Sequence, residues 1–308
     1  MAKQRIGFIG LGVMGAPMCR NLCRRLAESL ATDSAASTLE GYSISAFDLD
    51  HDRLQSAVEA GASAAQSIAA LAAGSDIVMM SLPGGPEVES VLCDKDGVFN
   101  NALPGALIID FSTTPVTLTQ QLAAEAAKQG LRYLDSPVAR TREAAENGTL
   151  AMMVGGTQAD FESASAILSC MASDVLHTGD IGCGQMAKIL NNMVLFQTVA
   201  ALAEAQTMAN RAGMSTERLF DALAQGSANS FALAQHGRKS MQPGEFPLQA
   251  FSVEYARKDL SYARQLAADT GTTASGADNV DHLFGQAIDS GWGEQYWPVI
   301  LKLLQKSG

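Results

Sequence analysis

Three glycines near the N-terminus have the spacing of a phosphate-binding turn. Gly10, Gly12 and Gly15 follow the apolar run at 5–9 directly and precede a segment with helical spacing. In such a turn one glycine makes the bend, one lets a pyrophosphate approach the backbone, and one lets helix and strand pack closely. The spacing predicts a dinucleotide site that includes the loop residues Leu11, Val13 and Met14. A tight turn without a ligand is the alternative.

An acidic residue ends the second apolar run, at 43–47. Asp48 stands where a carboxylate accepts hydrogen bonds from the adenosine ribose hydroxyls and repels a 2′-phosphate, which predicts NAD rather than NADP. The interval from the glycines is longer than usual, and a low-complexity insertion at 31–41 accounts for the difference. Asp50 and Asp52 are expected to be capping or surface residues.

Two later loops also follow apolar runs. SLPGG at 81–85 and DFST at 110–113 stand at predicted strand ends, where open α/β sheets bind their ligands. An ordinary turn from strand to helix would read the same way. The cofactor residues predicted from these two segments are Leu82, Pro83, Glu87 and Thr113.

The elements that must position these residues alternate along the chain. Short apolar runs are separated by alanine-rich helical segments, a pattern that predicts right-handed crossovers and a parallel sheet. The predicted strands are 5–9, 43–47, 76–81, 106–110, 131–135, 151–155 and 175–179. The fold class is therefore α/β, with an N-terminal Rossmann-type, doubly wound domain over 1–182.

The strands stop after Gly184. One segment then runs to Gly213 with apolar residues on nearly every face and no interior glycine or proline. A helix of this kind must be covered by other helices or by a second subunit. The remaining segments are expected to be helices that break at Gly226, at 243–247, at Gly271 and at Gly291, so an all-α domain is predicted over 183–308.

Composition limits the partners and the compartment. The net charge of −11 over 308 residues disfavours binding to nucleic acid. The sequence contains no uninterrupted apolar run of about 18 residues, the length that would indicate a membrane span. The five cysteines include no CxxC pair. The N-terminus enters the predicted strand at 5–9 almost at once and shows none of the segments of a secretory signal peptide. We expect reduced thiols and a cytoplasmic protein without a membrane partner.

Four segments together resemble the signatures of the β-hydroxyacid dehydrogenase family, and they occur in that family's order. They read GFIGLGVMGAPMCRNL, DSPVARTREAAENGTLAMMVGG, GQMAKILNNMV and FSVEYARKDLSYA. The family includes 3-hydroxyisobutyrate dehydrogenases, tartronate semialdehyde reductases, sulfolactaldehyde reductases and, more distantly, 6-phosphogluconate dehydrogenase. The resemblance implies a homodimer or homotetramer that interconverts a small anionic hydroxy acid and its semialdehyde with NAD.

The resemblance also makes Lys188 the catalytic residue. An ammonium there would hydrogen-bond the carbonyl oxygen and give up a proton as hydride arrives, and such help is commonly worth ~10²–10⁴-fold. Asn192 matches the family's substrate-orienting asparagine and is expected to be catalytic, with Asn191 beside it as a substrate residue. A lysine that merely extends from an apolar helix to the surface is the alternative.

A second lysine also matches the family pattern. Lys258 resembles the lysine that lies near the nicotinamide, and Asp259 would hold it in place. A surface salt bridge is the other interpretation.

The chain departs from the family at 139–141. The family usually has Ser-Gly-Gly there, whereas this chain has Ala139, Arg140 and Thr141, which we expect to bind substrate. The Arg140 guanidinium would fit carboxylate, sulfonate or phosphate oxygens in a bidentate way, although it could also be a surface residue. A similar Gly-Arg-Thr sequence in sulfolactaldehyde reductases suggests a sulfonated substrate. Those enzymes, however, have serines where this chain has Arg142 and Leu195.

Other classes of protein remain as alternatives. A catalytically inactive nucleotide-binding homologue would be expected to lack the lysine or the glycines. Imine reductases replace the lysine, and decarboxylating relatives have a much longer C-terminal part. No metal site is predicted, because the four histidines are scattered along the chain, at His51, His177, His236 and His282.

Overall fold

The computed structural model describes residues 4–31, 42–248 and 250–306, with the side chains of 29–31 left out. Most of the insertion expected at 31–41 therefore lies outside the described residues. The chain forms two compact units, Met1–Lys188 and Ile189–Gly308.

The first unit is built on a single sheet. Its described strands are β1 (Arg5–Ile9), β2 (Ser43–Phe47), β3 (Ser63–Ala64), β4 (Ile77–Met80), β5 (Leu107–Asp110), β6 (Arg132–Asp135), β7 (Val138–Ala139), β8 (Leu150–Gly155) and β9 (Ala172–Gly179). They run in the order β3-β2-β1-β4-β5-β6-β8-β7, with β9 paired to β8. The pairs from β3 to β6 are parallel, whereas β8 joins β6 and β7 in antiparallel fashion. The sheet is thus parallel apart from its far end.

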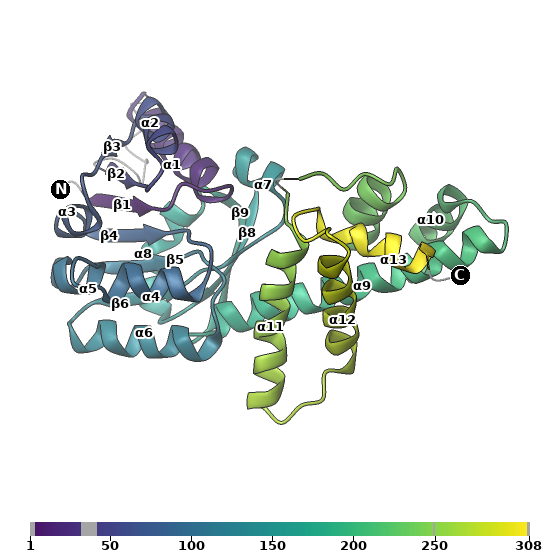
Figure 1. Ribbon diagram of the computed structural model, residues 1–308. Coiled ribbons are helices and arrows are strands. Elements are labelled where there is room, and N and C mark those ends of the chain that lie inside the picture. Colours follow the sequence, from purple (N-terminus) through teal and green to yellow (C-terminus); the bar gives the residue numbers. More distant parts are fainter. Residues whose placement is uncertain (1–3, 32–41, 249, 307–308) are drawn as a thin grey trace. The chain divides into compact units, whose positions relative to one another are not determined.

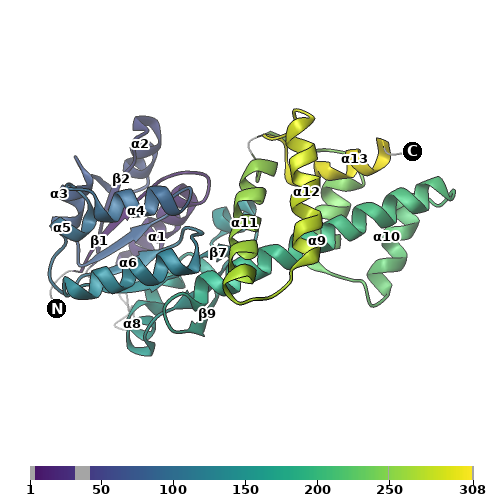
Figure 2. The same ribbon diagram turned by 60° about the horizontal axis from the view of Figure 1, so that its bottom comes forward.

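Helices cover both faces of this sheet, as Figures 1 and 2 show. One core lies under α1 (Gly15–Ala31), α2 (His51–Glu59), α7 (Arg142–Asn147) and α8 (Gln158–Leu168). A second core lies under α3 (Ile68–Ala73), α4 (Gly85–Cys93), α5 (Val98–Asn101) and α6 (Val116–Lys128). Because both faces are covered, the central strands β4 and β5 are buried along their whole length.

The second unit is helical. It contains most of α9 (Cys183–Arg211), then α10 (Thr216–Gln225), the π-helix η1 (Leu233–Met241), α11 (Val253–Asp269), α12 (Ser275–Asp289), the 3₁₀ turn η2 (Trp297–Ile300) and α13 (Leu301–Lys306). Its core centres on Trp297, whose ring lies 4.8 Å from that of Phe196 and 6.2 Å from that of Phe284. Burying such a side chain stabilises the fold by about 1.5–3 kcal/mol. The expected fold class, a Rossmann domain followed by an all-α domain, is confirmed.

The helix α9 is the one described helix that is long and apolar enough to cross a membrane, by length and composition alone. Phe196, Val199 and Ala203 on this helix are buried in the core of the second unit. A core helix of a folded domain passes the same test, so the finding is weak support for a membrane span.

Candidate active site

The turn after β1 needs glycine at two positions for reasons internal to the protein. Gly10 has a φ of +88°, and a Cβ there would collide with the carbonyl oxygen of Ser81. A Cβ on Gly15 would collide with the carbonyl oxygen of Gly10. These two glycines therefore make the bend and let α1 pack against the sheet.

Gly12 is different, because the protein itself leaves room for a side chain there. Among the residues that the structure describes, a Cβ on Gly12 would meet only Arg53 Nη1, at 3.9 Å. Nothing in this described part of the fold requires glycine at this position, whereas a pyrophosphate lying against the backbone would. The space at Gly12 fits a bound dinucleotide, with the first turn of α1 next to it. Of the other loop residues, Leu11 is buried, Met14 is half-buried and Val13 is exposed.

Asp48 lies at the end of β2 with its carboxylate fixed by backbone donors. Leu11 N donates to Oδ2 at 2.5 Å, and Asp50 N donates to Oδ1 at 2.8 Å. Each carboxylate oxygen can accept more than one hydrogen bond, so capacity for ribose hydroxyls remains. Asp50 caps α2 by accepting from Asp52 N, and Asp52 is an exposed residue of its first turn, as expected.

The loops after β4 and β5 lie beside each other. Ser112 Oγ accepts a hydrogen bond from Leu82 N at 2.9 Å. Thr113 is half-buried next to it, whereas Pro83 and Glu87 are exposed, Glu87 in the first turn of α4. Both loops leave the carboxyl ends of parallel strands, so the structure brings these predicted cofactor residues to one edge of the sheet.

Two buried carboxylates lie below this edge. Asp110 ends β5, and burial raises its pKa to about 7, against the lowering effect of the Ser112 N–H. Tyr133 also donates to Asp110, at 3.3 Å. Asp135 ends β6, and burial raises its pKa from the ordinary value although backbone donors oppose the shift. The sequence reasoning assigned neither residue.

The helix that carries Lys188 begins at this same edge. Asp135 accepts hydrogen bonds from Gly182 N and Gln185 N, both at 2.8 Å. Gln185 is fully buried, and its carboxamide bonds the loop after β5. Lys188 follows one turn later and is half-buried. A lysine on a helix anchored at the ligand-binding edge can serve as a proton donor.

The segment 139–141 has an unusual backbone conformation. Arg140 has a φ of +86°, the left-handed region that favours glycine. Its guanidinium is engaged by the protein: Nη1 donates to Thr149 O and Ser173 Oγ, and Nη2 to Asp174 Oδ2, all at 2.7 Å. In this structure the Arg140 guanidinium therefore bonds protein groups, and a role in substrate binding stays a prediction.

The two neighbours of Arg140 also contact the rest of the protein. Ala139 is buried in β7, and Thr141 Oγ1 caps α7 by accepting from Ala144 N at 3.3 Å. The backbone of this segment thus turns from a strand into a helix at Arg140.

The second unit contains a separate polar cluster. The buried Asn192 donates from Nδ2 to Asp259 Oδ2 at 2.8 Å, and Lys258 Nζ lies 3.1 Å from Asp259 Oδ1. This second contact is an ion pair by distance, without the angles of a hydrogen bond. Asn191 is exposed and donates to Asn192 Oδ1 at 3.2 Å. Asp259 therefore does pair with Lys258, as expected, and also bonds Asn192.

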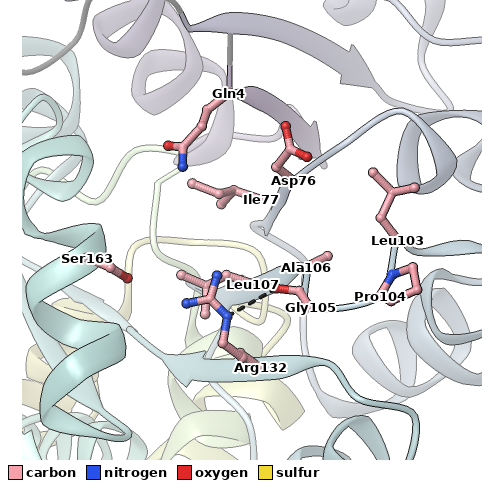
Figure 3. Close-up of a pocket in the computed structure, with 10 residues that line it drawn as sticks. All are labelled: Gln4, Asp76, Ile77, Leu103, Pro104, Gly105, Ala106, Leu107, Arg132 and Ser163. Atoms are coloured by element: carbon pink, nitrogen blue, oxygen red, sulfur yellow. Dashed lines mark hydrogen bonds between the residues drawn. The ribbon is translucent and has the colours of Figure 1, made fainter. Parts of the chain in front are cut away.

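A small cavity lies at the opposite edge of the sheet, where the strands begin. It has a volume of about 130 Å³, and Figure 3 shows the residues that line it. Asp76 there is paired with Arg5, and Arg132 is paired with Asp160. Open α/β sheets bind ligands at the carboxyl ends of their strands, so this cavity is not the cofactor site. Within 4–31, 42–248 and 250–306, no three His, Cys, Asp or Glu residues gather as metal ligands.

Comparison with known proteins decides the family. Residues 5–179 match the family described as the NAD binding domain of 6-phosphogluconate dehydrogenase. Residues 182–304 match the family described as NAD-binding of NADP-dependent 3-hydroxyisobutyrate dehydrogenase. The chain belongs to the β-hydroxyacid dehydrogenase family. It is an oxidoreductase that acts on CH–OH groups with NAD.

Relatives of this dehydrogenase span nearly its whole length. It is 32% identical over 302 residues to a 2-(hydroxymethyl)glutarate dehydrogenase of Eubacterium barkeri, covering 98% of this chain and 95% of that one. It is 30% identical to an NAD-dependent L-serine dehydrogenase of Pseudomonas aeruginosa, covering 97% of each chain. The solved structure of Mycobacterium tuberculosis 3-hydroxyisobutyrate dehydrogenase with L-serine superposes with a TM-score of 0.86 at 30% identity, covering 98% and 99%.

Sequence reasoning missed three residues that hold this edge of the sheet together. Asp135 and Gln185 fall inside the segments that carry the family resemblance, and Ser112 falls inside the DFST loop. The available signal was an acidic residue at a predicted strand end and a glutamine one turn before Lys188. Neither signal predicts which groups the Asp135 and Gln185 side chains bond.

Proposed function

We propose that this dehydrogenase oxidises a small β-hydroxy acid, or reduces its semialdehyde, with NAD preferred over NADP. The observation that carries the proposal is the convergence of Gly12, Asp48 and the start of the Lys188 helix at the carboxyl ends of the parallel strands. We also propose that residues 1–182 form the cofactor-binding domain and that residues 183–308 form a domain for substrate binding and assembly.

When bound, NAD supplies the hydride acceptor or, as NADH, the donor. Lys188 is proposed to hold the substrate oxygen and to take or give its proton. Asn192, one helical turn later, and Asn191 orient the substrate, and Lys258 contacts the cofactor. Cofactor contacts are assigned to Gly10, Leu11, Gly12, Val13, Met14, Gly15, Asp48, Leu82, Pro83, Glu87 and Thr113.

The substrate class follows from a shared chemical unit. The names of the three relatives above give 2-(hydroxymethyl)glutarate, L-serine and 3-hydroxyisobutyrate. Each of these acids has a hydroxymethyl group on the carbon next to a carboxylate. We propose that this chain acts on the same unit, with the acid group bound at the turn formed by Ala139, Arg140 and Thr141.

The sulfonate alternative rested on the Arg140 guanidinium. Because that group donates to Thr149, Ser173 and Asp174, its geometry gives no support to a sulfonated or otherwise strongly anionic substrate. A simple carboxylate, which is the group that the three named acids share, is the better proposal.

Assembly and compartment remain proposals. Leu190, Val194 and Met208 are exposed on α9, with 38%, 58% and 65% of their surface accessible. An exposed apolar stripe on one helix commonly marks a subunit interface, and we propose that a second copy covers it in a homodimer or homotetramer. A cytoplasmic enzyme without nucleic-acid or membrane partners is the proposed setting.

A panel of short hydroxy acids, assayed by NADH absorbance, tests the substrate proposal. It should compare 3-hydroxyisobutyrate, L-serine and 2-(hydroxymethyl)glutarate with secondary 2-hydroxy acids of similar size, such as lactate, 2-hydroxybutyrate and 2-hydroxyglutarate, which also have a hydrogen on the carbon that bears the hydroxyl. The hydroxymethyl acids should have kcat/KM values at least about tenfold higher. Activity confined to the 2-hydroxy acids, or to uncharged alcohols, would contradict the proposal.

A further inference from the structure

The first turn of α9 is capped by a residue that lies far away in the sequence. The first N–H groups of a helix have no partner within the helix, and a residue directly before the helix usually accepts from them. Here Asp135, at the end of β6, accepts from Gly182 N and Gln185 N, both at 2.8 Å. The Asp135 side chain has no solvent-accessible surface. The beginning of α9 is therefore fastened to the sheet itself.

Gln185 fastens the same turn to a second strand. Its Nε2 donates to Ser112 O at 2.7 Å, and its Oε1 accepts from Thr114 N at 3.1 Å. These two partners flank Thr113 in the loop after β5. Because both ends of the carboxamide are bonded and fully buried, the turn has a fixed orientation relative to that loop.

Two glycines confine the Asp135 carboxylate. A Cβ on Gly155 in β8 would lie 2.5 Å from Oδ1 and 2.8 Å from Oδ2 of Asp135. A Cβ on Gly184 would lie 2.7 Å from the Asp135 carbonyl oxygen. The carboxylate consequently has little room to move, and any added atom on this side would displace it.

We propose that Asp135 and Gln185 are positioning residues for Lys188, holding the first turn of its helix at the carboxyl ends of β6 and β5. Lys188 follows Gln185 by three residues, so it belongs to the turn that these two side chains fix. Loss of either anchor lets that turn shift, and a misplacement of about 1 Å can reduce a reaction rate ~10²-fold. The inference rests on the proposed role of Lys188.

The test compares Asp135→Asn and Gln185→Leu with matched controls away from the site. Asp76→Asn removes a carboxylate that accepts Arg5 N at the opposite edge of the sheet (Figure 3). Gln206→Leu removes a buried carboxamide that donates to Met241 O. The two site variants should lose about 10–100-fold in kcat, with KM changed less than about threefold. The dissociation constant of NADH should change less than about threefold in Asp135→Asn, whose bonds run to Gly182 and Gln185 and not to the loop that carries Thr113. The two controls should keep kcat within about twofold.

Two readouts separate positioning from loss of folded protein. The stoichiometry of NADH binding, from fluorescence titration, should stay at the wild-type value while kcat falls. Amide hydrogen exchange at 182–185 should become faster in Asp135→Asn without cofactor. If kcat falls only in proportion to the fraction that binds NADH, the residues are merely structural and the inference is wrong. If Asp135→Asn does not fold, Gly155→Ala displaces the same carboxylate and should give the same kinetic pattern.

Lys188→Ala in the same series keeps the two hypotheses apart. If this variant is inactive but Asp135→Asn and Gln185→Leu turn over like the wild type, the positioning role is refuted and the proposed function stands. If Lys188→Ala keeps more than about a tenth of wild-type kcat, Lys188 is not the proton donor and the inference falls with it.

Discussion

Arg140 offers a prediction in which two parts of one residue act in opposite directions. Its backbone has a φ of +86°, a region that costs a residue with a side chain roughly 1–2 kcal/mol. Its side chain meanwhile bonds Thr149, Ser173 and Asp174. Arg140→Ala removes the bonds and keeps the strain, whereas Arg140→Gly removes both.

The difference between the two variants isolates the backbone. Glycine relieves the strain but loses about 0.4–1 kcal/mol through the greater freedom of the unfolded chain. Arg140→Gly should therefore be more stable than Arg140→Ala by about 1 kcal/mol. In a unit of this size such a difference raises Tm by roughly 2–4 °C. Urea and thermal denaturation of the two variants measure it directly.

The kinetic part of this prediction addresses the side chain. Because the guanidinium is engaged within the protein, Arg140→Gly should change kcat/KM less than about threefold, and equally for an acid and its neutral amide. Asp174→Asn should behave in the same way. A loss of about 30-fold or more that is selective for the acid would show that the guanidinium leaves its partners and binds substrate, and would refute this reasoning.

Three further predictions concern the cofactor and pH. Gly12→Ala should weaken NADH binding at least about tenfold without lowering Tm, because among the described residues its Cβ meets only Arg53, at 3.9 Å. Normal NADH affinity would show that the pyrophosphate does not bind against this turn. The kcat/KM for NAD should be at least about tenfold higher than that for NADP, and Asp48→Asn should reduce this difference. Equal kcat/KM values for NAD and NADP in the wild type would show that Asp48 does not discriminate between the two cofactors. Burial lowers the pKa of His236 to about 4, below its unfolded value, so the free energy of unfolding should fall as pH drops from about 6.5 towards 4. His236→Gln should flatten this loss in urea denaturation, and an unchanged slope would exclude His236 as its source.

Periodicity was enough to predict most of the sheet. The strands at 5–9 and 43–47 are as predicted, and the others differ by a few residues at their ends. It missed β3 and β7 because each has only two residues and therefore no pattern. The antiparallel pairing of β8 with β6 was also beyond reach, because a strand's pattern does not record the direction of its neighbour.

The site was predictable in its residue types more than in its contacts. Gly10 and Gly12 stand out by their spacing and Asp48 by its place at the end of the second strand, and their contacts with the cofactor stay predictions. The sequence identified the unusual residue at 140, but the direction of a long side chain depends on partners at Ser173 and Asp174, more than 30 positions away. Asp135 and Gln185 were missed for the same reason, since their partners are backbone groups brought together only by the fold.

Hydride transfer itself is measured most directly by isotope. The purified enzyme is incubated with NAD and a hydroxy acid deuterated on its hydroxymethyl carbon, and the NADH formed is analysed by mass spectrometry. We predict that the deuterium appears in the NADH, and that Lys188→Ala, which should still bind NADH, forms less than about a tenth as much in the same time. Product without deuterium in the NADH, or equal transfer by Lys188→Ala, would contradict a lysine-assisted hydride transfer from this carbon.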